Sequence, residues 1–283
     1  MKLGLIVEGG GMKCVYNAGI LDRFLDNDIS FDYVIGVSAG SANAASFLAA
    51  QRGRNLRFYT EHSKNPEYFG ARPFLRDGNL FNLTYVYGNL TNSDGSDPLD
   101  YDALMVNPAE YEIVATDAGS GEPHYFSKHD LKKDDYRIIM ASCAMPGACQ
   151  PVEVDGRMYY DGGVSDSIPV GRALFKGCDR VVVLLSNPRD YVKQHEHLRG
   201  AYTLLCRQYP EIIRRLNRRH IDYMKEKEYL LSLESQGRAF VFCPSESHIS
   251  AFTMNTDELK KMYESAVSDY DGRSAEFESF IKS

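Results

Sequence analysis

Residues 33–41 read Tyr33-Val34-Ile35-Gly36-Val37-Ser38-Ala39-Gly40-Ser41. The aromatic and β-branched residues at the start of this stretch predict a short buried strand, and the small residues that follow, up to Ala50, predict a helix. The Gly-x-Ser-x-Gly pattern between them is typical of a sharp strand-to-helix turn in which only glycine fits at Gly36 and Gly40. Because such a turn exposes its serine hydroxyl above a helix N-terminus, Ser38 is a candidate nucleophile. The alternative is a glycine-rich turn whose serine only caps the helix.

A second glycine-rich stretch lies nearer the N-terminus, in Glu8-Gly9-Gly10-Gly11-Met12-Lys13-Cys14. The apolar run 3–7 predicts a strand before it, and the apolar spacing from Val15 to Leu25 predicts a helix after it. Three successive glycines let a ligand oxygen approach backbone amides at a helix N-terminus, which suits a phosphate or an oxyanion. The spacing matches neither common nucleotide-binding pattern, whereas acyl ester hydrolases carry such loops as an oxyanion hole. A plain tight turn is the alternative.

Two strand-loop-helix units in the first fifty residues, both with continuously apolar strands, predict a mostly parallel sheet covered by helices on both faces. Functional residues then belong at the carboxyl ends of the parallel strands. Further strands are expected at 111–116, 123–126, 152–155, 157–160, 180–185 and 240–242, and helices at 134–143, 170–175, 201–236 and 255–269. Residues 51–100 show no clean period, and their many aromatic side chains are candidates for core packing or for a pocket wall.

The composition is that of a folded globular protein, with 283 residues, 43% of them hydrophobic and 25% charged. The net charge of −7 argues against a general nucleic-acid-binding protein. The six cysteines include no Cys-x-x-Cys pair, which favours reduced thiols. No apolar run reaches the roughly 18–20 residues of a transmembrane helix, and the N-terminal run is too short for a signal peptide. We therefore expect a cytoplasmic protein with a single domain over 1–283, formed by a catalytic core at 1–185 and a helical extension at 186–283 packed on it.

Basic residues recur along the predicted helix 201–236, where they alternate with apolar residues. They are Arg207, Arg214, Arg215, Arg218, Arg219, Lys225 and Lys227. A basic amphipathic helix can lie on an anionic membrane surface, and the alternative is an ordinary solvated helix face. Peripheral membrane contact is thus one expectation for this protein.

The turn Asp161-Gly162-Gly163 follows the predicted strand 157–160, which places an aspartate at the same sheet edge as Ser38. An aspartate that only stabilises its own turn is the alternative. Acyl transfer needs a nucleophile, a base and donors for the developing oxyanion. Ser38, Asp161 and the glycine-loop amides supply one of each.

A Ser-His-Asp triad in the usual hydrolase chain order would need a histidine after the aspartate. The four histidines in this part of the chain are His195, His197, His220 and His248. The first three lie in polar or helical stretches with no strand before them, so that His248, which follows the last predicted strand, is the only plausible third member.

Taken together, these motifs resemble those of the patatin-like phospholipases. The glycine loop is similar to that family's Asp-Gly-Gly-Gly-x-Lys/Arg-Gly motif, with Glu8 in place of the aspartate and Cys14 in place of the last glycine. The elbow 36–41 matches the nucleophile motif, Asp161-Gly162-Gly163 matches the Asp-Gly-Gly/Ala motif, and 141–146 is similar to the Ala-Ser-x-Ala-x-Pro segment that precedes it. The resemblance covers roughly residues 3–170.

This resemblance implies a three-layer α/β/α fold and a serine lipid acyl hydrolase that uses a Ser38–Asp161 dyad without histidine. It implies phospholipid or a related fatty acyl ester as the substrate, and no metal or other cofactor. The residues that it implies for the oxyanion hole and substrate contacts are Gly9, Gly10, Gly11, Met12 and Lys13. Two other functions remain open: a Ser-His-Asp carboxylesterase for small esters, and a lipid-binding protein without turnover.

Overall fold

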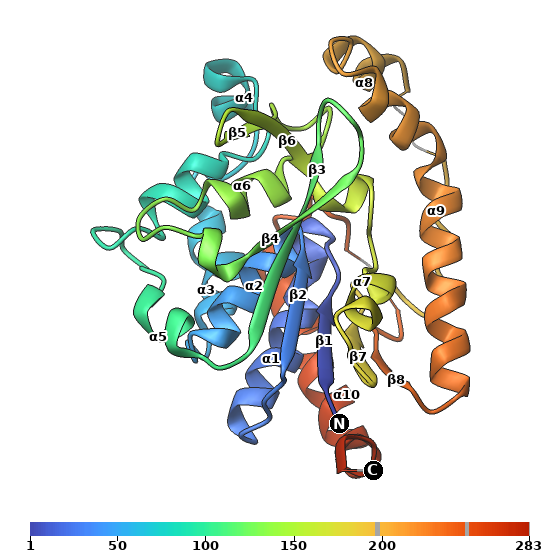
Figure 1. The fold of residues 1–283 in the computed structure, drawn as a ribbon. Helices are drawn as coiled ribbons and strands as arrows, with labels where there is room; N and C mark the ends of the chain where they lie inside the picture. Colours follow the sequence, from blue (N-terminus) through green and yellow to red (C-terminus); the bar gives the residue numbers. More distant parts are fainter. Residues whose placement is uncertain (196–198, 247–248, 283) are drawn as a thin grey trace.

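A mixed sheet forms the centre of the protein (Figure 1). The computed structural model describes residues 1–195, 199–246 and 249–282. Within these ranges the strands are β1 (Leu3–Val7), β2 (Tyr33–Val37), β3 (Glu110–Asp117), β4 (Pro123–Ser127), β5 (Val152–Val154), β6 (Arg157–Asp161), β7 (Arg180–Leu184) and β8 (Ala239–Phe242). Their order is β5-β6-β3-β2-β1-β7-β8, and β4 also pairs with β3. The run from β3 to β8 is parallel, whereas β4, β5 and β6 are antiparallel to their partners, so the sheet is mostly parallel, as predicted.

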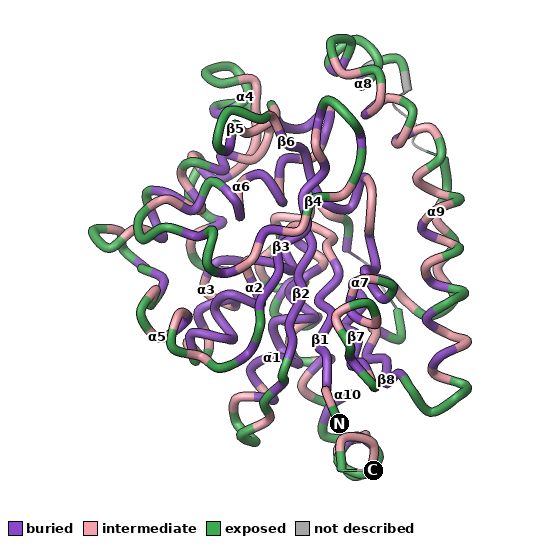
Figure 2. Tube along the Cα trace, in the orientation of Figure 1, coloured by how far each residue is buried: buried purple, intermediate pink, exposed green. Residues whose placement is uncertain are grey.

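Helices cover both faces of this sheet. In the described ranges the α-helices are α1 (Val15–Asp26), α2 (Ala39–Leu48), α3 (Arg54–Thr60), α4 (Ala71–Asp77), α5 (Tyr101–Val106), α6 (Arg137–Cys143), α7 (Val170–Phe175), α8 (Arg199–Leu205), α9 (Pro210–Ser235) and α10 (Thr256–Lys282). Leu5 and Val7 of β1 belong to an apolar cluster with α1 and α10, whereas Ile6 between them belongs to one with α7 and α9. This alternation follows from the two-residue period of a strand. Strands β1, β2, β3, β7 and β8 are almost entirely buried between the two helical layers (Figure 2), which confirms the three-layer α/β/α fold.

One edge of β3 holds both β2 and β6. β2 pairs with the first five residues of β3 and β6 with the last three, while β4 occupies the opposite edge. Because β2 is parallel to β3 and β6 is antiparallel to it, β2 and β6 run toward each other along this edge. Val37 ends β2 opposite Val114, and Asp161 ends β6 opposite Ala115. The two strand ends therefore meet.

The C-terminal part of the chain adds to the same layers. β8 pairs with β7, and α10 packs along α1. Gly19 of α1 permits this close packing, because a methyl group there would lie 2.7 Å from the carbonyl oxygen of Tyr263 and 2.8 Å from Ala266 Cβ. The division at residue 185 stays a prediction. Across the described ranges, no helix combines the length and the apolar character needed to cross a membrane.

Some helix boundaries differ from the prediction. The helix expected over 201–236 is two helices, α8 and α9, and α9 begins at Pro210, whose missing N–H suits a first helical position. The last helix extends past 269 to Lys282, because Tyr270 and Phe277 are buried on its inner face. The helix expected from 134 begins at Arg137, since Asp134 has a left-handed φ of 62°.

Candidate active site

Ser38 lies in a tight turn between β2 and α2. Its backbone has φ 54° and ψ −135°, an unusual conformation for a residue with a side chain. A methyl group on Gly36 would lie 2.4 Å from Ser41 Cα, and one on Gly40 would lie 2.4 Å from the carbonyl oxygen of Val7. These approaches are too close for any Cβ, so the turn requires glycine at both positions.

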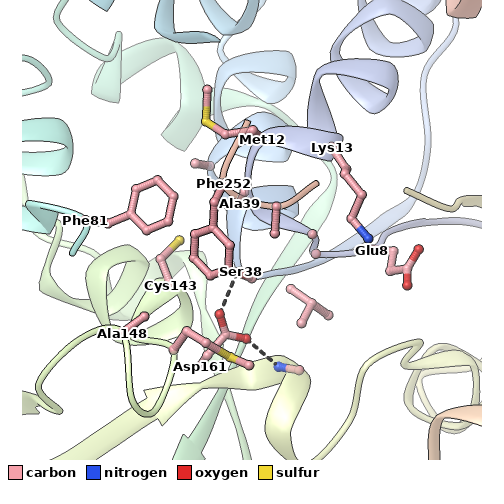
Figure 3. A pocket seen from close by; sticks show the side chains of 18 of the residues that line it. Glu8, Met12, Lys13, Ser38, Ala39, Phe81, Cys143, Ala148, Asp161 and Phe252 are labelled. Carbon is pink, nitrogen blue, oxygen red and sulfur yellow. Dashed lines mark hydrogen bonds between the residues drawn. The ribbon is translucent and has the colours of Figure 1, made fainter. Parts of the chain in front are cut away.

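Ser38 and Asp161 are joined by a hydrogen bond. Ser38 Oγ donates to Asp161 Oδ2 at 2.6 Å, as Figure 3 shows. The other carboxylate oxygen, Oδ1, accepts the backbone N–H of Gly163 at 2.8 Å. Burial raises the pKa of Asp161, while the hydrogen bond from Ser38 and the positive charge of Arg219 oppose this rise. The carboxylate is thus held in one orientation, facing the serine hydroxyl.

The two glycines after Asp161 fit closely against their neighbours. A methyl group on Gly162 would lie 2.2 Å from the carbonyl oxygen of Val114 in β3. One on Gly163 would lie 3.1 Å from Arg219 Nη2 and 3.2 Å from Asp161 Oδ1. The turn is therefore packed between the sheet on one side and α9 on the other.

The glycine loop packs directly against the serine. A methyl group on Gly9 would lie 2.7 Å from Ser38 Cβ and 3.5 Å from Ser38 Oγ. The backbone N–H of Met12 donates to the carbonyl of Ala251 at 3.1 Å, and that of Lys13 donates to the carbonyl of Gly10 at 3.3 Å. Among the described residues, the N–H groups of Gly9, Gly10 and Gly11 have no such partner. Of the five residues predicted for the oxyanion hole and substrate contacts, these three are the ones whose amides are open to a ligand.

Glu8 fixes the start of the glycine loop. Its carboxylate accepts the backbone N–H of Ser186 at 2.6 Å and lies 3.3 Å from Ser186 Oγ, just beyond the end of β7. Its backbone carbonyl accepts from Asn17 Nδ2 at 3.1 Å and from Cys14 Sγ at 3.5 Å. Burial raises the pKa of Glu8, and the Ser186 amide and the charge of Lys13 oppose this. The two departures from the family motif, Glu8 and Cys14, thus contact each other within the loop.

Ser38 and Asp161 line a cavity of about 610 Å³. One wall is apolar and aromatic, and its members include Met12, Phe58, Tyr59, Tyr68, Phe69, Leu80, Phe81, Leu83, Val86, Tyr87, Ala148 and Phe252. The rings of Phe69, Phe81 and Phe252 pack together, with centroids 4.7–6.0 Å apart. Figure 3 shows Phe81 and Phe252 on one side of Ser38 and Lys13 with Glu8 on the other. The cavity therefore offers an apolar side and a polar side to a single ligand.

Polar side chains on the other wall include Lys13, Asn187 and Lys193. Lys13 Nζ donates to Asn187 Oδ1 at 2.5 Å and lies 5.6 Å from the ring centre of Tyr191. Burial lowers the pKa of Lys13, while the neighbouring Glu8 raises it. Within the described residues, no group of His, Cys, Asp and Glu side chains is arranged to hold a metal ion.

The histidines considered for a triad do not lie in the described part of this site. The rings of His195 and His220 lie 3.7 Å apart, and neither lines the cavity. His197 and His248 fall outside the described residues.

Two residues near the dyad were not singled out from the sequence. Ser142 Oγ accepts the backbone N–H of Ser38 at 2.8 Å. Arg219 Nε donates to the carbonyl of Gly163 at 2.5 Å. Ser142 belongs to the Ala-Ser-x-Ala-x-Pro segment, so this motif could have identified it as a residue of the site. The sequence pattern places Arg219 among the basic residues of the helix, but its spacing from Leu216 and Tyr223 puts it on the apolar face of α9.

Comparison with known proteins identifies the class. The sequence profile of the patatin-like phospholipases matches residues 5–174, more than half of the chain, and the chain belongs to this family. The family is one of lipid acyl hydrolases. A second profile, described only as a domain of unknown function (DUF6363), matches residues 209–282.

The chain is also similar to individual known proteins. The uncharacterized protein YjjU of Escherichia coli K12 is 32% identical over 192 residues, which are 66% of this chain and 52% of that protein. An enzyme named lysophospholipase nte1, from Aspergillus terreus, is 24% identical over 179 residues, or 63% of this chain and 11% of its own length. The crystal structure of VipD from Legionella pneumophila covers 96% of this chain and 67% of its own, with 12% identity and a TM-score of 0.44. The chain thus spans about half the length of the E. coli relative and a smaller part of the fungal one.

Proposed function

We propose that this protein is a serine lipid acyl hydrolase that cleaves fatty acyl esters with Ser38 as nucleophile and Asp161 as base. The observation that carries this proposal is the 2.6 Å hydrogen bond between Ser38 Oγ and Asp161 Oδ2 at the wall of a large, mainly apolar cavity. Nucleophile and base in direct contact are the arrangement that activates a serine hydroxyl. Membership of the patatin-like phospholipase family supports the lipid ester as substrate.

Acylation follows from this contact. Asp161 accepts the proton of Ser38 as Oγ forms a bond to the ester carbonyl carbon, and the carbonyl oxygen becomes an oxyanion. Gly9 lies beside Ser38, and the open amides of Gly9, Gly10 and Gly11 in this loop would donate to that oxyanion. The bond to the alcohol oxygen then breaks, and the alcohol leaves with the proton from Asp161. Water attacks the acyl-serine in the same way and releases the fatty acid.

The strength of Asp161 as a base comes from its surroundings. An ordinary aspartate is a weak base toward an alcohol, with a pKa near 3.9. Burial raises the pKa of Asp161, which makes the carboxylate a better proton acceptor in this cavity. The oxyanion donors supply the larger share of the stabilisation, because a buried oxyanion gains more from fixed donors than one in water.

The two sides of the cavity suit the two parts of a lipid ester. The aromatic wall around Phe81 and Phe252 would hold the acyl chain, since burying a chain methylene there is favourable by about 0.8 kcal/mol. The opposite wall, with Lys13, Asn187 and Lys193, would face the polar alcohol or head group. No cofactor is needed for this chemistry.

We also propose that the protein meets membranes with the rim of this cavity rather than with the basic face of α9. On that helix Arg214, Arg215 and Arg218 are paired with carboxylates. The rim elements α4 and α8 lie at the end of the molecule where the parallel strands end (Figure 1). They carry Leu75, 84% exposed, and Leu204, 65% exposed, and such exposed apolar groups gain by entering a lipid surface.

Hydrolysis of a chain-length series of p-nitrophenyl esters by wild type, Ser38→Ala and Asp161→Asn tests the proposal. We expect activity to rise with acyl length and both variants to be inactive but folded. A fluorophosphonate probe should label wild type and not Ser38→Ala. Wild-type protein that is folded but neither labelled nor active would instead indicate a lipid-binding protein, and His248→Ala with full loss of activity would indicate a Ser-His-Asp esterase.

A further inference from the structure

Helix α9 lies along the outer side of the loop that follows Asp161. Arg219, Tyr223 and Glu226 recur at spacings of four and three residues, which places them on one face of the helix. Leu216, Tyr223 and Leu230 on the same face are buried. This face packs on the turn Gly162–Val164 and on β8. Two of its polar residues, Arg219 and Glu226, contact the backbone of the loop directly.

Arg219 holds the beginning of the loop. Its Nε donates to the carbonyl of Gly163 at 2.5 Å. The N–H of the same residue, Gly163, donates to Asp161 Oδ1 at 2.8 Å. Gly163 thus links the two side chains, because its carbonyl accepts from Arg219 and its N–H donates to Asp161.

Glu226 holds the end of the loop. Its Oε2 accepts the backbone N–H groups of Ser167 at 3.0 Å and Ile168 at 2.9 Å. Glu226 follows Arg219 by seven residues, which is about two helical turns or 10 Å along the axis. Between the two contacts, Ser167 Oγ donates to the carbonyl of Gly163 at 2.8 Å and closes the loop on itself.

The charge of Arg219 also acts on Asp161. Arg219 from α9 and Lys193 from the segment after β7 both lower the pKa of this carboxylate against the effect of burial. Of the nearby thiols, burial raises the pKa of Cys14 and Cys143, and that of Cys149 to about 12, so that they stay neutral. The carboxylate also accepts hydrogen bonds from the hydroxyl of Ser38 and from the N–H of Gly163.

We propose that α9 is the positioning element for Asp161, with Arg219 and Glu226 holding the loop 161–168 from both ends. This gives a role to a helix that lies outside the patatin match, in the segment described as a domain of unknown function. The role rests on the proposed function, since it assumes that Asp161 is the base. It makes Arg219 a positioning residue that acts on the reaction through Gly163 and through its charge.

Hydrogen exchange tests the contact independently of catalysis. In Arg219→Met and Glu226→Leu, amides of the peptide 161–168 should exchange at least tenfold faster than in wild type. Arg218→Met is the matched control, because Arg218 is the neighbouring residue on the exposed side of α9 and pairs with Asp222. Glu226→Gln should keep wild-type protection, since its amide oxygen can still accept both N–H groups. Unchanged exchange in Arg219→Met and Glu226→Leu would overturn the proposal, whether or not the protein hydrolyses esters.

Kinetics on p-nitrophenyl butyrate then test the positioning role. Arg219→Met should lower kcat about 10- to 100-fold with KM within twofold of wild type, because a displaced base costs rate more than binding. Removing the positive charge raises the pKa of Asp161, so the acid limb of its pH–rate profile should move to higher pH. Arg219→Lys keeps the charge and should keep the wild-type acid limb. Faster exchange with an unchanged kcat and pH profile would show a merely structural helix and overturn the positioning role.

Discussion

Ser142 accepts the backbone N–H of Ser38 through its Oγ at 2.8 Å and donates to the carbonyl of Val114 in β3 at 2.6 Å. The side chain therefore bridges the nucleophile turn and the central sheet. The backbone N–H of Ser38 is therefore already bonded within the protein. In the proposed function the oxyanion donors are the glycine-loop amides, and the N–H of Ser38 is not among them.

Ser142→Ala tests this bridge. Two buried backbone groups would lose their partner, which lowers the free energy of unfolding by about 1–3 kcal/mol. We also expect slower labelling of Ser38 by a fluorophosphonate, because the elbow is less firmly held. Thermal unfolding and a labelling time course measure both effects. Ser235→Ala, which changes an exposed serine at the end of α9, is the control and should stay within about 0.5 kcal/mol of wild type.

Gly9→Ala tests the contact between the glycine loop and the serine. The added methyl group would lie 2.7 Å from Ser38 Cβ and 2.9 Å from the carbonyl oxygen of Val37, so the loop must move away. We expect at least a 100-fold loss of esterase activity, in line with the loss of an oxyanion donor. Gly171→Ala in α7 meets nothing within 4 Å and should keep full activity. Equal activities in the two variants would contradict the oxyanion assignment.

Asp161→Asn should stabilise the protein while removing its activity. Burial raises the pKa of Asp161 in the folded state, so the folded carboxyl binds its proton more tightly than the unfolded one. The stability of wild type therefore falls as pH rises through the interval between the unfolded pKa of 3.8 and the folded value. Asparagine carries no charge and escapes this loss. Melting temperatures should show a gain for the variant at pH 7 that shrinks toward pH 4, and a gain independent of pH would exclude this cause.

Phe81→Ala tests the acyl side of the cavity. Phe81 packs with Phe69 and Phe252 on the apolar wall. Losing an aromatic contact with the acyl chain costs about 1.5 kcal/mol, so kcat/KM for a dodecanoyl ester should fall about tenfold. The value for a butanoyl ester should change less than twofold. Phe175→Ala, on an exposed position of α7, is the control and should leave the chain-length profile unchanged.

Leu75→Ser combined with Leu204→Ser tests the rim. Cosedimentation with anionic vesicles should fall at least tenfold, because two exposed leucines no longer enter the lipid surface. Hydrolysis of a soluble butanoyl ester should be unchanged, since neither residue lines the cavity. Val106→Ser, at an equally exposed apolar position on α5, should bind vesicles as wild type does. Vesicle binding that is unaffected by the double change would instead indicate that the basic face of α9 contacts the membrane.

Much of the candidate site is local in the sequence, and this is why it could be predicted. The elbow around Ser38, the loop Gly9–Gly11 and the turn at Asp161 each depend on glycines needed within a few residues. That the turn at Asp161 lies within hydrogen-bonding distance of Ser38, 123 residues earlier in the chain, depends instead on the pairing of both β2 and β6 with β3. Only the shared edge of β3 explains it, and no local pattern encodes which strands share an edge.

The contributions of α9 could not be predicted for a different reason. An arginine on an amphipathic helix looks the same in sequence whether it faces water or a carbonyl group. Arg218 and Arg219 are neighbours in the chain, yet one pairs with Asp222 at the surface and the other reaches Gly163. The start of α9, in contrast, can be predicted from Pro210, because proline favours the first position of a helix.

Strand β3 determines how far Ser38 lies from Asp161. Strand β2, which leads to Ser38, ends opposite Val114, and strand β6, which ends in Asp161, ends opposite the next residue, Ala115. One extra residue inserted between them would separate the two ends by about 3.3 Å, the rise of a single strand residue. That is more than the whole 2.6 Å span from Ser38 Oγ to Asp161 Oδ2. The length of β3 is therefore as much a part of the proposed active site as the two side chains that it spaces.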